Sequence, residues 1–210
     1  MELPTLEITQ PKRSYRRDGK QAILEAALEL FTHQGYEETS VEDLRKAAGF
    51  KSKASLYAHF ESKEAVAEAL SVQIFKLTER QILIEYEKAG SDPLEILIAI
   101  TKGFIRWGLE HPKEYTFRFI RTQQNRLVQG QYDYTTDQFS IAYGKMLELL
   151  QYLRQQYPVR QIADEALISV TLGLVSRSVI DREAFGNISL EEQVNQVLEL
   201  CMGIFFSEPI

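Results

Sequence analysis

Apolar residues recur along this chain with the period of an α-helix from about residue 18 to about residue 206. The first stripe sits at spacings of three and four residues and consists of Ile23, Ala26, Ala27, Leu30 and Phe31. Gly35 follows it as a left-handed stop. No segment shows the apolar-polar alternation of a strand, so the pattern predicts an all-α protein.

Start and stop signals divide the chain into about nine helices. Thr39 with Glu42 and Ser189 with Glu192 have the spacing of capping boxes, and Asp92-Pro93 combines an N-cap with a first-turn proline. The helices are expected at about residues 18–34, 41–48, 52–60, 62–88, 93–110, 113–127, 135–156, 161–184 and 190–206.

Charge and helix length divide the chain into three parts. Residues 1–16 carry two prolines and no periodicity, so they are expected to form a flexible basic arm. Residues 17–78 contain three helices, the second short and followed by a glycine turn, which is typical of a helix-turn-helix at about residues 40–60. Residues 79–210 should form a separate helical bundle. Residues 1–63 hold 10 basic and 10 acidic side chains, so the net charge of −6 falls on residues 64–210 (14 against 20).

Composition argues against several classes of protein. No stretch approaches about 18 uncharged apolar residues, and the first 14 residues hold no signal-peptide core, so we expect a soluble, cytoplasmic protein with no membrane partner. The only cysteine, Cys201, is expected to be a small buried hydrophobe. His33, His59 and His111 form no metal-ligand pair, and there is no phosphate-binding glycine loop or nucleophile motif. We therefore expect no enzyme, no metal and no cofactor.

The third helix presents an outer face of small side chains. If Leu56 and Phe60 point inward, Ala54, Ser55 and Ala58 point outward at 100° per residue. Such a face can approach the floor of the DNA major groove, and the flanking Tyr57 and His59 can reach phosphates. Lys51, Ser52 and Lys53 lie at the amino end, where free N–H groups add to the attraction for anions.

The segment TSVEDLRKAAGFKSKASLYAHFESKEAV resembles the helix-turn-helix of TetR-type regulators. The resemblance covers about residues 17–78, includes AILEAALELFTHQGY in the first helix, and is most specific in LYAHFESKE. It implies that Thr39, Tyr57, His59 and Lys63 hold phosphates and that residues 51–55 read bases. Gly49 to Tyr57 is one residue longer than the commonest spacing in the family, which leaves open which of residues 51–54 meets a base. The predicted DNA-binding residues are Arg16, Arg17, Thr39, Ser40, Lys51, Ser52, Lys53, Ala54, Ser55, Tyr57, His59 and Lys63.

The resemblance also implies a homodimer, because two copies of a short helix can read a palindromic operator. The last two long helices are the expected contact, although their apolar stripes could equally form the core of one chain. The predicted interface residues are Leu167, Val170, Leu174, Val194, Val197, Leu198, Cys201 and Phe205.

The resemblance implies a small-molecule effector of unknown identity. Aromatic and basic side chains between residues 104 and 143 could line its pocket or simply form core and solvated charge. The candidates are Phe104, Trp107, Phe117, Arg118, Arg121, Phe139 and Tyr143. The expected function is a repressor that releases double-stranded DNA on binding the effector; an activator, or a regulator controlled by a partner protein, remains the alternative.

Overall fold

The computed structural model describes residues 18–120 and 139–210, and within these ranges the protein is all-α. Nine α-helices lie in the described part of the chain, as the sequence predicted. The β pairing there is limited to one isolated antiparallel bridge between Val159 and Phe206.

Four helices form the amino-terminal half. Their ends follow the predicted signals closely except in the third, which was predicted at about residues 52–60 and ends at Tyr57. They are α1 (Gly19–His33), α2 (Val41–Ala47), α3 (Lys53–Tyr57) and α4 (Lys63–Tyr86). Gly35, at φ 96°, and Gly49, at φ 78°, take the left-handed conformation that ends α1 and α2. The Ser62 side chain accepts a hydrogen bond from the Ala65 amide and starts α4.

The carboxy-terminal half contains α5 (Pro93–Glu110), α6 (Pro112–Tyr115), α8 (Phe139–Leu153), α9 (Asp164–Ile180) and α10 (Leu190–Phe205). The predicted cap of α5 is confirmed, because Asp92 Oδ1 accepts hydrogen bonds from the amides of Leu94 (2.8 Å) and Glu95 (3.1 Å). The predicted capping box of α10 is also confirmed between Ser189 and Glu192.

Two predicted helices of the carboxy-terminal half differ from the structure. After α6 the chain turns into a π-helix, η1 (Thr116–Ile120), and the rest of the predicted 113–127 helix lies outside the described residues. The predicted 161–184 helix was too long at both ends. At its start, Arg154 binds the carbonyl oxygens of Arg160 (2.6 Å) and Ile162 (2.5 Å) and holds them in a loop. At its end, Asp181 leaves helical geometry, and a 3₁₀ turn, η2 (Arg182–Phe185), follows.

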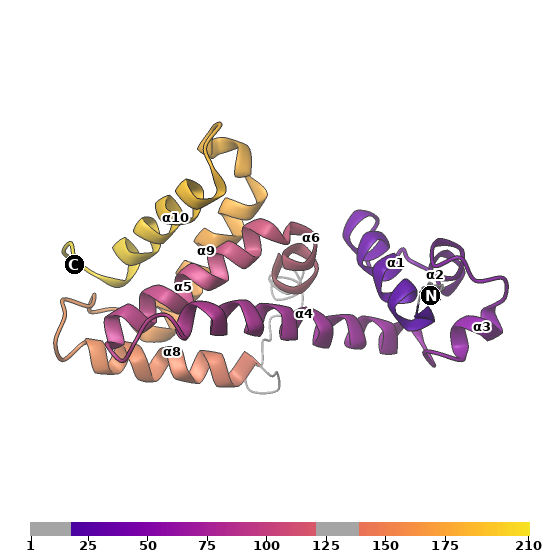
Figure 1. The fold of residues 1–210 in the computed structure, drawn as a ribbon, viewed down its shortest axis with the longest axis horizontal. Helices are drawn as coiled ribbons and strands as arrows, with labels where there is room; N and C mark the ends of the chain where they lie inside the picture. The colour runs from indigo at the N-terminus through magenta and orange to yellow at the C-terminus, as the bar shows by residue number, and fades with distance from the viewer. Residues whose placement is uncertain (1–17, 121–138) are drawn as a thin grey trace, which may run out of the picture.

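The long helix α4 joins the two halves of the molecule (Figure 1). Helices α1 to α3 surround its amino end, whereas α5, α8, α9 and α10 gather around its carboxyl end. The domain boundary expected at residue 78 therefore falls inside α4, and Thr78 is buried there.

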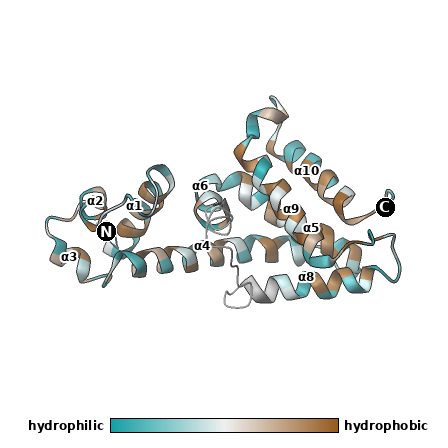
Figure 2. Ribbon diagram, turned by 180° about the vertical axis from the view of Figure 1, so that it is seen from behind, coloured by the Kyte–Doolittle hydropathy of each residue, from teal (hydrophilic) through white to brown (hydrophobic). Residues whose placement is uncertain are grey.

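A continuous core crosses from one half to the other. One cluster of buried side chains includes Phe31 of α1, Ile74 of α4, Trp107 of α5, Tyr115 of α6 and Val197 of α10. Hydrophobic ribbon is prominent on α5 and α9, which lie side by side in the carboxy-terminal half (Figure 2). The two halves are thus packed against each other as well as being joined through α4.

Candidate nucleic-acid interface

A partly buried arginine holds the turn between α2 and α3. Arg45 makes a two-pronged ion pair with Glu42, at 3.1 Å from Nε and 2.7 Å from Nη2, and its Nη1 also donates to the Phe50 carbonyl oxygen. This hydrogen-bonded ion pair lowers the pKa of Glu42 below its ordinary value. Arg45 is thus held by Glu42 within α2 and ties the Phe50 carbonyl oxygen, in the turn after Gly49, to that helix.

That turn presents α3 to solvent. Residues 51–55 are all exposed, as are Ala58 and His59, and Tyr57 is 48% exposed. Leu56 and Phe60 are buried, so the orientation predicted for this helix is confirmed. Ser52 caps α3: its Oγ accepts from the Ser55 amide at 3.2 Å and lies 2.9 Å from the Ser55 hydroxyl.

The start of α2 differs from the prediction at Thr39. The capping box is formed by Ser40 and Asp43, and the predicted box of Thr39 with Glu42 is wrong. The reason is that the buried Thr39 donates its hydroxyl to the Gly35 carbonyl oxygen at 2.6 Å, which leaves the cap to its exposed neighbour. The hydrogen bonds from Ser40 lower the pKa of Asp43.

Lys63 is held against the rest of the amino-terminal half. Its Nζ donates to the Tyr36 carbonyl oxygen at 2.9 Å and lies 4.2 Å from the centre of the Tyr36 ring. The Tyr36 hydroxyl in turn donates to Glu64 at 3.1 Å, and burial followed by this hydrogen bond raises the Tyr36 pKa. The Lys63 ammonium thus braces the loop between α1 and α2, and its third N–H donor is left for a further acceptor.

His59 packs across the start of α1. Its ring lies edge-on to Phe50, with centroids 5.6 Å apart. A methyl group added at Gly19 would come within 2.5 Å of His59 Nε2, so the first residue of α1 must be small for this contact. The His59 ring therefore sits near the amino end of α1 as well as beside α3.

The structure gathers most of the predicted DNA-binding residues on one end of the molecule, around α2 and α3 (Figure 1). Arg16 and Arg17 lie outside the described residues, as does the predicted arm. Sequence reasoning missed Arg45 and Tyr36, which organise this end from partly buried positions. The Glu42–Arg45 spacing was a visible signal of the ion pair, but nothing in the sequence pointed to the carbonyl oxygen of Phe50.

The predicted effector-pocket residues do not form one group. Phe104 and Trp107 join Tyr115 and Phe119 in an aromatic cluster with centroid separations of 4.9 to 6.4 Å. Phe117 instead stacks on Phe31 of α1 at 5.8 Å, and Tyr143 packs against a second core cluster around Leu97 and Leu150. Arg118 is partly buried, while Arg121 and the side chain of Phe139 lie outside the described part of the chain.

Most of the predicted dimer residues lie inside one chain. Leu167, Val194, Val197, Cys201 and Phe205 are at most 2% exposed, because their stripes pack into the two core clusters. Leu174 and Leu198 are partly buried, and only Val170 is well exposed, at 57%. The predicted stripes therefore form core, and the opposite faces of α9 and α10 carry the exposed side chains.

Comparisons with known proteins agree with this geometry. Residues 23–70 match the family of bacterial regulatory proteins described as the tetR family. This match spans α1 to the first turns of α4, which is the end of the molecule that presents α3. Residues 23–70 therefore form a TetR-type DNA-binding segment. The chain is accordingly a TetR-type, DNA-binding transcriptional regulator.

Two individual relatives are similar over longer stretches of the chain. A Staphylococcus aureus protein named as the negative transcriptional regulator IcaR of the biofilm operon is 27% identical over 155 residues, 72% of this chain and 73% of its own length. The A-factor receptor protein of Streptomyces griseus is 35% identical over 77 residues, 37% of this chain and 25% of that protein.

Solved structures show the same likeness. The TetR-family regulator PfmR of Thermus thermophilus covers 89% of this chain and 99% of its own, with a TM-score of 0.59 and 27% identity. KstR2 of Mycobacterium tuberculosis, called a ketosteroid transcriptional regulator, shares the fold at a TM-score of 0.68 and 18% identity, over 91% of this chain and 97% of its own.

Two other kinds of site are absent from residues 18–120 and 139–210. No helix there is long and apolar enough to cross a membrane. No cluster of three or more His, Cys, Asp or Glu side chains there could hold a metal ion.

Proposed function

We propose that this TetR-family chain is a repressor that binds a palindromic operator as a homodimer and releases it when a small molecule binds the carboxy-terminal half. The observation that carries the proposal is the outward presentation of residues 51–55 on a turn fixed by Arg45. Repression is favoured because the relative IcaR is named as a negative regulator. That the chain is not an enzyme stays a prediction.

Tyr57 and Lys53 are assigned different roles in DNA binding. Tyr57 flanks α3 and its hydroxyl would bind a phosphate, so it supports affinity for any sequence. Lys53 and Ser55 face the groove and would select the site. Lys63 would brace the loop between α1 and α2 and offer its remaining N–H donor to a phosphate. Thr39 would act through this loop alone, because it is buried and its hydroxyl is bound to Gly35.

The test of this assignment begins with selection of bound fragments from random duplex DNA, which should yield a palindrome. Tyr57→Ala should then lose at least tenfold in affinity on every selected fragment, since a hydrogen bond to a charged group contributes about 1.5–3 kcal/mol. Tyr152→Ala is the matched control, because Tyr152 is 46% exposed against 48% for Tyr57 but lies on α8. Equal losses in both variants, or none in either, would overturn the phosphate contact.

The dimer contact is proposed on the exposed faces of α9 and α10. Val170, Gly173 and Ile180 share an exposed face of α9, and Leu200 is exposed on α10. Small residues such as Gly173 allow two helices to approach closely. Val170→Glu should convert a dimer into a monomer in light scattering, whereas Leu83→Glu, at an exposed site on α4, should not. A dimer that persists in Val170→Glu would refute this face.

The effector is proposed to act on the aromatic cluster of α5, α6 and η1. The Trp107 indole N–H is buried without a hydrogen-bond partner, and a ligand acceptor would satisfy it. A ligand inserted there would also press on η1, whose Phe117 stacks on α1. Trp107 is the only tryptophan, so its fluorescence reports occupancy directly. Compounds that release the operator without altering that fluorescence would place the effector site elsewhere.

The alternative functions predict different outcomes in a cell. Deleting the gene of a repressor raises transcription from the selected operator, whereas deleting that of an activator lowers it. Release by a protein in place of a small molecule would show as operator release by a cell extract that is lost after protease treatment.

A further inference from the structure

We propose that the groove between α1 and α4 binds a small amphiphilic anion, a carboxylate or similar head group carrying an apolar chain. The groove has a volume of about 620 Å³ and is lined by Lys20 and Leu24 of α1 and by one face of α4 from Ala65 to Arg80. This site is separate from the DNA-reading surface of α3 and from the aromatic cluster of α5 and η1, and it requires neither of those assignments.

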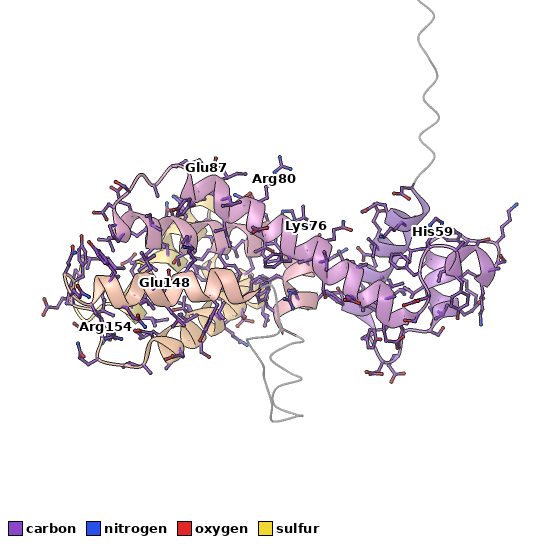
Figure 3. The ribbon with its side chains drawn as sticks, turned by 90° about the horizontal axis from the view of Figure 1, so that it is seen from below. His59, Lys76, Arg80, Glu87, Glu148 and Arg154 are labelled. Atoms are coloured by element: carbon purple, nitrogen blue, oxygen red, sulfur yellow. The ribbon has the colours of Figure 1, made fainter. Side chains whose placement is uncertain are left out.

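The head group would be held by basic side chains that lack partners. Within residues 18–120 and 139–210, Lys76 and Arg80 make no ion pair or hydrogen bond, and both are exposed on the groove. They are four residues apart on α4 and so project from the same side of the helix. Figure 3 shows both along α4, between His59, which lies among the amino-terminal helices, and Glu87, which follows the carboxyl end of α4. Two cations at this spacing can bind one carboxylate together.

Apart from Lys20, Glu68 and Gln73, the rest of the groove is apolar. Leu24, Ala69, Val72 and Leu77 line it, and Leu77 is 42% exposed there. Ala69 and Lys76 lie seven residues apart, so the apolar wall extends about 10 Å along α4 from the basic pair. A carbon chain lying on this wall with its head at Lys76 and Arg80 would cover the exposed Leu77 side chain.

The net charge of the lining favours an anion. Lys20, Lys76 and Arg80 stand against one acidic residue, Glu68, on this wall of a protein whose net charge is −6. A neutral lipid would leave the cations unused, and a small inorganic anion would leave the apolar wall in water. The combination therefore selects a molecule that has both a charged head and an apolar body.

The experiment is calorimetric titration of the full chain, without DNA, using decanoate below its aggregation concentration. Wild-type protein should bind decanoate, and Lys76→Gln with Arg80→Gln should bind it at least tenfold more weakly. The control is Lys88→Gln with Lys145→Gln, which removes the same charge from exposed sites outside the groove and should bind like wild type. Circular dichroism should show that all three chains are folded.

Decanol and butanoate separate the two parts of the ligand. Decanol, which lacks the charge, and butanoate, which lacks the long chain, should each bind at least tenfold more weakly than decanoate. The proposal is overturned if wild type does not bind decanoate, if the groove variant binds it as well as wild type does, or if either probe binds as tightly as decanoate. Because no DNA is present, these outcomes leave the repressor proposal to its own test.

Discussion

The stacking of Phe117 on Phe31 should couple the two halves of the molecule energetically. The rings lie 5.8 Å apart and 16° from parallel, and they join η1 to α1. An ion pair between Lys113 and Glu29 also joins α6 to α1, but both side chains are about half exposed, and such pairs contribute only about 0–1 kcal/mol. The aromatic pair, in which Phe31 is fully buried, should be the stronger contact.

A double-mutant cycle measures this coupling. Phe31→Leu, Phe117→Leu and the double variant are unfolded in urea and followed by circular dichroism. Aromatic pairs contribute about 0.5–1.5 kcal/mol beyond the area they bury, so the double variant should be less destabilised than the sum of the single variants by that amount. Operator affinity measured on the same proteins should show whether the contact also sets the position of the DNA-binding end.

The control cycle pairs Phe31→Leu with Leu167→Ala, since Leu167 lies in the other core cluster. The losses of stability caused by mutations at distant sites add within about 0.3–0.5 kcal/mol, so the losses of this pair should add as well. If the Phe31 and Phe117 changes are also additive within that margin, the stacking does not couple the halves, and the proposed route from effector to α1 is refuted.

Three further outcomes are expected. Gly103→Ala should be less stable than Gly144→Ala by about 1–3 kcal/mol in urea unfolding, because the new methyl would lie 3.1 Å from the Ile82 Cα, whereas at Gly144 it meets nothing within 4 Å; equal stability would refute the close contact. Ser189→Ala should flatten the loss of stability below pH 5, because hydrogen bonds from Ser189 lower the Glu192 pKa and their contribution disappears as that carboxylate is protonated; an unchanged acid profile would contradict this. Cys201, whose pKa burial raises to about 12, should react with a thiol reagent only on unfolding, and labelling of folded protein at pH 8 would contradict its burial.

Local signals in the sequence predicted the helices where one side chain decides the outcome. Asp92 and Ser189 cap α5 and α10 as their spacing indicated, because no other group competes for the same backbone amides. At α2 two overlapping capping boxes fit the sequence, Thr39 with Glu42 and Ser40 with Asp43. The sequence could not show that Thr39 would be buried against Gly35. The end of α9 was missed because Asp181 has no strong propensity to stop a helix.

Which way the helices face was harder to predict than where they lie. Leu56 and Phe60 gave α3 a clear inward side, so its outward surface could be predicted. The stripe of α10 around Val197 was equally clear, but an apolar stripe fits the core of one chain as well as a contact between two. Phe117 shows the same limit, because its ring belongs to a contact with Phe31, about 86 positions earlier in the chain, and long-range pairing leaves no local pattern.

Because α4 runs unbroken from one half of the protein to the other, a small tilt at one end becomes a larger displacement at the other. Its 24 residues extend about 36 Å, so a tilt of about 5° at the effector end would move the opposite end by about 3 Å. Successive base pairs are about 3.4 Å apart along the duplex. A change in packing too small to disturb any single contact in the core could therefore shift α3 by nearly one base pair against its site.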